Sequence, residues 1–198
     1  MKSTVAVSTI LLALCALTGC GTPSAARDER EPVTASDLTD ADRRARARLE
    51  LAGAYYARGQ METALDEVKL ALQARPELVE AYNLRGLVLA AMGDAQLAEA
   101  SYKRALQIQS RDADTLHNYA LFLCQQKRFD ESWVQFQAAL SQPMYRGAAR
   151  TYAAKGLCQT RAGMWLEAEG SFMRSFELDP SDPSTSMSLS DVLFRRAD

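Results

Sequence analysis

The sequence is poor in the side chains that most often perform catalysis or bind metals. Among its 198 residues there are a single histidine, His117, and four cysteines. It contains no H-E-x-x-H, G-x-S-x-G, P-loop or dinucleotide-binding motif. Cys124 and Cys158 are too few and too far apart in the sequence to form a zinc site. We therefore expect no catalytic residue, no metal, no cofactor and no small-molecule substrate, and we do not expect an enzyme.

The chain also lacks an excess of charge of either sign. Lys and Arg number 23 and Asp and Glu number 25, so the formal net charge is -2. Nucleic-acid recognition needs a basic face, and we expect no nucleic-acid partner. Glycine and proline are scarce, with 10 and 6 residues. Long stretches of Ala, Leu, Glu, Gln and Arg, which are strong helix formers, instead favour a helical chain with short turns.

The only long apolar run lies at the N-terminus. Lys2 is followed by an apolar stretch and by residues 17–20, Leu-Thr-Gly-Cys. One positive charge, a short apolar run and small residues before a cleavage site are typical of a secretory signal peptide. Residues 17–20 also match the bacterial lipobox, so we expect residues 1–19 to be removed and Cys20 to be lipidated. The alternative is an ordinary signal peptide with a coincidental cysteine.

The residues after Cys20 indicate where the protein is anchored. Gly21 follows the cysteine, whereas Asp at this position is associated with retention in the inner membrane of many Gram-negative bacteria. This predicts an anchor in the outer membrane, on its periplasmic face. Residues 20–38 are polar, contain two prolines and show no apolar period, so they are predicted to be a flexible lipidated tether.

Residues 39–198 contain an internal repeat. Four positions recur along the chain with spacings of 34, 34 and 36 residues, and all four absorb the same two extra residues. Three of these columns hold small residues, with one serine in each of two of them, and the fourth holds bulky residues. They are Ala52, Gly86, Ala120, Gly156; Ala64, Ala98, Ser132, Ala168; Ala71, Ala105, Ala139, Ser175; and Val68, Tyr102, Phe136, Phe172. This period and pattern predict an all-α tetratricopeptide-repeat solenoid of about four and a half helical hairpins.

The repeat also sets the unit boundaries. The units are predicted at about 45–78, 79–112, 113–148 and 149–182, with a terminal helix at 183–196. Turns within the hairpins are expected at Gly59, Gly93, Lys127-Arg128 and Gly163.

Cys124 and Cys158 are one repeat apart, 34 residues, on the first helices of adjacent units. Such helices pack side by side, and facing side chains can reach the Cα separation that a disulfide prefers. The periplasm is oxidising, which favours the bridge. The alternative is a pair of reduced, buried cysteines.

The first helices of the units are expected to line a concave protein-binding groove. Counting from the small position of each unit, we expect the groove to be lined by Tyr56, Asn83, Leu87, His117, Leu121 and Leu157. They mix apolar and polar groups, which suits an amphipathic helix or strand of a partner protein. The alternative is that some of them only pack between neighbouring helices.

Two segments carry a more specific family resemblance. Residues 118–124 read Asn-Tyr-Ala-Leu-Phe-Leu-Cys, and residues 155–158 read Lys-Gly-Leu-Cys. Together with the lipobox and the repeats, they resemble the PilF/PilW family of type IV pilus biogenesis lipoproteins, the secretin pilotins. The resemblance implies a partner in the pilus secretin, whose localisation or multimerisation the protein would assist, or a role in pilus stability. It also implies that the family's cysteines map onto Cys124 and Cys158.

The resemblance has one departure. Family members usually carry more repeats, whereas this sequence stops within a fifth.

The alternative to a role in pilus biogenesis is that of another outer-membrane repeat lipoprotein, one that holds cell-wall or other envelope enzymes.

Overall fold

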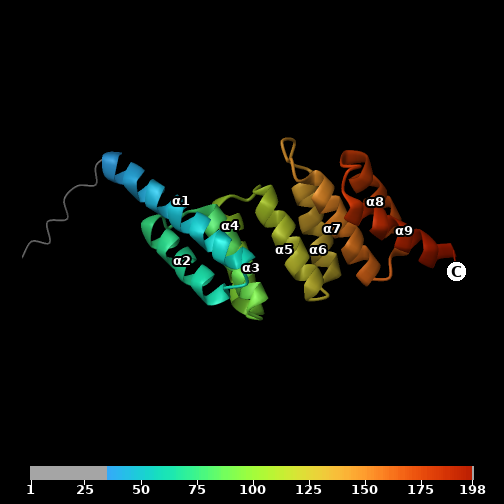
Figure 1. Cartoon of the computed structure of the whole chain (residues 1–198), viewed down its shortest axis with the longest axis horizontal. Helices are drawn as coiled ribbons and strands as arrows, with labels where there is room; N and C mark the ends of the chain where they lie inside the picture. Colours follow the sequence, from blue (N-terminus) through green and yellow to red (C-terminus); the bar gives the residue numbers. More distant parts are fainter. Residues whose placement is uncertain (1–34, 198) are drawn as a thin grey trace, which may run out of the picture. The chain divides into compact units, whose positions relative to one another are not determined.

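The structure is a computed structural model that describes residues 35–197, which are almost entirely helical (Figure 1). The helices are α1 (Ala35–Ala57), α2 (Met61–Ala74), α3 (Val79–Ala91), α4 (Ala95–Ile108), α5 (Ala113–Gln125), α6 (Phe129–Leu140), α7 (Ala148–Arg161), α8 (Trp165–Leu178) and α9 (Pro183–Ala197). Consecutive helices pair as hairpins, and the first helix of each hairpin packs on the first helix of the next. This is the predicted tetratricopeptide-repeat architecture, with α9 as the terminal helix.

The four repeating columns form the seams between the helices. All sixteen residues are buried. Small and large residues meet directly: a Cβ atom added at Gly86 would lie 2.6 Å from Cε1 of Tyr102, and one at Gly156 would lie 2.8 Å from Cε1 of Phe172. The small residues are therefore needed for the aromatic rings to reach the neighbouring helix.

The hairpin turns lie where the sequence predicts them. Gly59, Gly93 and Gly163 have φ of 75°, 84° and 77°, a backbone conformation that side chains disfavour. The third hairpin places Lys127 at the equivalent position, with φ of 60°. The last helix begins at Pro183, where the terminal helix is predicted, and Asp182 before it accepts a hydrogen bond from the Ser184 amide at 3.0 Å.

Two segments differ from a regular array. Helix α1 begins at Ala35, ahead of the predicted start of the repeat domain at residue 39. Its first turns are charged and have no apolar period that could mark a helix start, and an i,i+4 pair between Asp42 and Arg46 at 3.0 Å supports the helix there. The two extra residues of the third unit lie in the loop 141–147 between α6 and α7.

Candidate protein-binding surface

A pocket opens between the first three units, and we call it the Tyr102 pocket. Its wall combines side chains from α1, α3, α4 and α5, and its volume is about 250 Å³. Its main lining side chains are Tyr56, Leu87, Tyr102, Asn118, Leu121 and Gln125. The pocket exists because first helices of successive units lie side by side, so residues one repeat apart, such as Leu87 and Leu121, face the same space.

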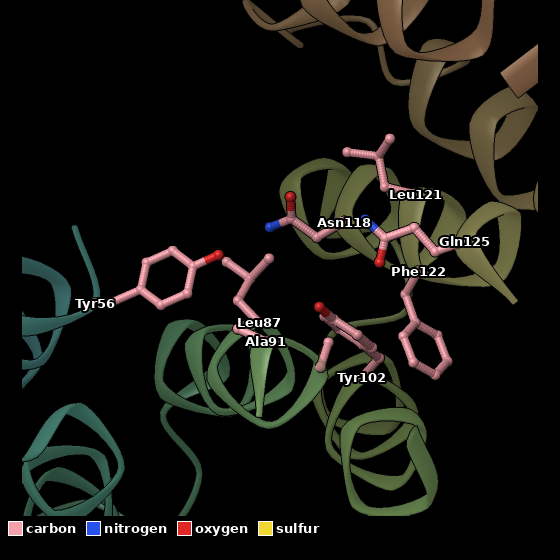
Figure 2. Close-up of a pocket in the computed structure, with 9 residues that line it drawn as sticks. Tyr56, Leu87, Ala91, Tyr102, Asn118, Leu121, Phe122 and Gln125 are labelled. Atoms are coloured by element: carbon pink, nitrogen blue, oxygen red, sulfur yellow. The ribbon is translucent and has the colours of Figure 1, made fainter. Parts of the chain in front are cut away.

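The pocket mixes apolar walls with neutral polar groups. Figure 2 shows the Asn118 and Gln125 amides and the Tyr102 hydroxyl directed toward the space that Leu87 and Leu121 border. The Asn118 side chain is held in place because its Nδ2 donates a hydrogen bond to Oδ1 of Asn83, at 3.0 Å. This pair joins α3 to α5 beside the pocket and fixes the direction of the Asn118 amide.

Tyr102 is the most unusual residue of the pocket. It comes from α4, a second helix, and its side chain is 0% exposed. Its ring stacks against Tyr119, with centroids 5.6 Å apart, and lies 5.7 Å from that of Phe122. Burial raises the pKa of the Tyr102 phenol well above its ordinary value, and the nearby Tyr56 adds to the shift. Its hydroxyl oxygen has no hydrogen-bond partner among the described residues.

An ion-pair network supports the units that carry the pocket. Arg128 Nη1 lies 2.6 Å from Oε2 of Glu99, and Tyr119 donates a hydrogen bond to Glu99 Oε1 at 2.9 Å. The hydrogen bond from Arg128 lowers the pKa of Glu99 to about 2. The network ties α4 of the second hairpin to the third hairpin, so the Tyr102 side of the pocket is held by more than apolar packing.

Three of the six predicted groove residues lie together in this pocket, namely Tyr56, Leu87 and Leu121. Asn83 is half-buried beside the pocket and accepts the hydrogen bond from the Asn118 amide. Leu157 is 49% exposed on α7 and is not among the residues that line this pocket.

The placement of His117 in the groove is wrong. Its side chain is only 5% exposed, and its Nδ1 lies 2.8 Å from the Thr151 hydroxyl of α7. Burial, followed by the positive charge of Arg150, lowers the pKa of His117 to about 4. The repeat placed His117 on the correct helix, but its ring lies against Thr151 of α7 and Phe136 of α6 and does not face open space.

Sequence reasoning missed three of the polar residues that line the pocket, Tyr102, Asn118 and Gln125. In the sequence Tyr102 stands out only as the bulky member of its repeat column. The signal that could have found it is its hydroxyl, since the same column has Val68, Phe136 and Phe172 in the other units.

Cys124 and Cys158 are joined by a disulfide in the structure. Their Cα atoms are 5.9 Å apart, and the bridge connects α5 to α7. Both cysteines are buried, and they pack in one cluster with Phe136 and Ala120. The bridge therefore crosses the junction of the third and fourth units, while Cys20 lies outside the described residues.

Residues 35–197 contain no group of three or more His, Cys, Asp or Glu side chains that could hold a metal ion. Over the same residues, no helix is both long and apolar enough to cross a membrane.

The repeated hairpins and the pocket between first helices define a tetratricopeptide-repeat protein. In agreement, the tetratricopeptide-repeat family matches residues 79–112, the range of the second predicted unit. The chain is 28% identical over 192 residues to the type IV pilus assembly protein PilF of Pseudomonas aeruginosa. The aligned residues cover 97% of this chain and 74% of PilF.

Solved structures agree with this relationship. The structure of Pseudomonas aeruginosa PilF superposes with a TM-score of 0.75 and 27% identity, over 80% of this chain and 71% of that one. PilW, a widely conserved type IV pilus biogenesis factor, superposes with a TM-score of 0.70 and 26% identity, over 75% of this chain and 68% of PilW. The chain is thus homologous to PilF and PilW, and the family resemblance drawn from its sequence is confirmed.

Proposed function

We propose that this protein is a lipid-anchored, protein-binding scaffold in type IV pilus biogenesis. The observation that carries the proposal is the similarity to PilF, a type IV pilus assembly protein, over 97% of the chain. The likeness to PilW, a type IV pilus biogenesis factor, supports it independently. The array of helical hairpins suits this role, because such arrays present extended surfaces to other proteins.

The proposal includes a location and a partner. Cys20 would carry the lipid, and two or more acyl chains give stable membrane anchoring. Gly21 after this cysteine favours the outer membrane, where the protein would face the periplasm. The partner would be the pilus secretin, whose subunits the protein would help to reach the outer membrane and to multimerise.

Deletion of the gene in its native host tests the proposal. We expect loss of twitching motility and of secretin multimers from the outer-membrane fraction, and both should return when the wild-type gene is restored. Cys20→Ser should fail to restore them, because the unlipidated protein is released or left uncleaved. Cys15→Ser, which changes a cysteine of the predicted signal peptide, is the matched control and should restore both.

Normal motility and normal secretin multimers in the deletion strain would contradict the pilus role. A defect confined to the cell wall would instead favour a scaffold for cell-wall enzymes. Outer-membrane fractionation of the Cys20→Ser protein that matches wild type would contradict the lipid anchor.

A further inference from the structure

The hydroxyl of Tyr102 is not needed for packing. In the fourth unit Phe172 occupies the same repeat position and packs on Gly156, as the Tyr102 ring packs on Gly86. Phe136 fills the equivalent seam of the third unit and is fully buried. Two other units therefore build this seam with a phenyl ring, and only the second unit adds a hydroxyl.

The Tyr102 hydroxyl is also buried without a hydrogen bond, which is unfavourable for stability. Tyr102 is 0% exposed, and its oxygen has no hydrogen-bond partner among residues 35–197. Buried polar groups in native proteins are nearly always hydrogen-bonded, and an unbonded one lowers stability. Its position in the wall of a pocket gives the hydroxyl a use that a seam residue does not need: it can donate to a group that enters the pocket.

The remaining lining residues indicate what that group is. All of them are uncharged, with Leu87 and Leu121 as apolar walls and the Asn118 and Gln125 amides as neutral polar groups. A charged side chain would lose its hydration here without gaining an opposite charge. A volume of about 250 Å³ lies below the roughly 300–1,000 Å³ of small-molecule sites, and suits one side chain with its backbone unit.

We propose that the Tyr102 pocket binds an uncharged segment of a partner protein. The segment places one aliphatic side chain between Leu87 and Leu121, and one of its carbonyl oxygens accepts a hydrogen bond from the Tyr102 hydroxyl. This rests on the proposed protein-binding function and specifies the chemistry of the partner. Neighbouring side chains cover the oxygen in this conformation, so the carbonyl reaches it when one of them changes rotamer, as is common on binding.

The test is a nuclear magnetic resonance titration of the full chain, read at the methyl groups of Leu87 and Leu121. The probe is N-acetyl-leucine N-methylamide, which carries one aliphatic side chain and two carbonyl groups. We expect saturable shifts with a dissociation constant on the order of 1 mM, as for a fragment of this size. The alanine and glutamate analogues should bind more weakly, the first for lack of apolar contact and the second because of its charge.

Two variants separate recognition from folding. Tyr102→Phe should keep or raise the melting temperature and weaken binding of the leucine probe by roughly 2- to 10-fold, the effect of one hydrogen bond. Leu121→Ala, read at Leu87, should also weaken it. Tyr82→Phe removes a phenol on α3 outside the pocket lining and should leave binding unchanged.

The proposal is overturned if the Leu87 and Leu121 methyl groups show no saturable shift. It is also overturned if the glutamate analogue binds as well as the leucine one, or if Tyr102→Phe binds like wild type. The probe contains no pilus component, so these results are independent of the motility and secretin assays that test the proposed function.

Discussion

Lowering the pH should destabilise the junction between the third and fourth units through His117. Its side chain is buried, and its Nδ1 lies 2.8 Å from the Thr151 oxygen. The Thr151 hydroxyl donates to the Gly147 carbonyl at 3.0 Å, so its oxygen is left to accept a hydrogen bond from His117. The neutral imidazole can donate this hydrogen bond through Nδ1, and a second proton added to the ring would be buried near the cationic Arg150.

The size of the effect follows from the two pKa values of His117. In the unfolded chain the pKa is about 6.5, and in the folded protein it is lowered to about 4. Above about pH 6.5 both states are neutral at this residue and stability is unaffected. Between about pH 6.5 and pH 4 only the unfolded state binds the proton, so the free energy of unfolding decreases as the pH is lowered. The loss should be about 2 kcal/mol at about pH 5 and roughly 3 kcal/mol when complete.

Urea denaturation of wild type and of His117→Gln at about pH 7.5 and about pH 5 measures this loss. Glutamine can still donate to Thr151 but does not titrate, so the variant should lose less stability between the two pH values. Glu99, with its pKa lowered to about 2, contributes stability that is lost only below about pH 4.5, outside this window. Equal pH dependence of the two proteins would refute the reasoning.

Three further predictions concern packing, the disulfide and the anchor. Gly86→Leu should lower the free energy of unfolding by about 1–3 kcal/mol because it overpacks the seam with the Tyr102 ring, whereas exposed Gln96→Ala should cost under about 0.5 kcal/mol; equal melting temperatures would contradict the register. Reducing the Cys124–Cys158 bridge, whose loop spans 34 residues, should lower the free energy of unfolding by roughly 3–4 kcal/mol. Hydrogen exchange should then show the third and fourth units opening first, and two alkylated thiols in unreduced periplasmic protein would rule out the bridge. Mass spectrometry of the membrane-extracted protein should find acyl chains on Cys20, and an unmodified Cys20 would rule out the anchor.

Much of the fold could be predicted from the sequence because repeat proteins are held by contacts between neighbours. Each column of the repeat, such as Ala52, Gly86, Ala120 and Gly156, occupies one position of the hairpin, so its period reveals both the helices and their seams. The turns were predictable for the same reason, since Gly59, Gly93 and Gly163 adopt a positive φ at equivalent places. The start of α1 was not, because its charged first turns have no apolar period.

The sequence by itself determined the class of architecture, the helices of the repeating units and the 34-residue spacing of Cys124 and Cys158. Only the tertiary structure decided which side of a first helix is open. His117 and Leu121 lie one helical turn apart on α5, yet α7 covers the first while the second borders the Tyr102 pocket. Periodicity reports which residues are equivalent between units, but accessibility depends on how closely two particular helices approach. That approach is set by side chains from several units at once. For the same reason Tyr102 of α4 lines a pocket together with residues of α1, α3 and α5.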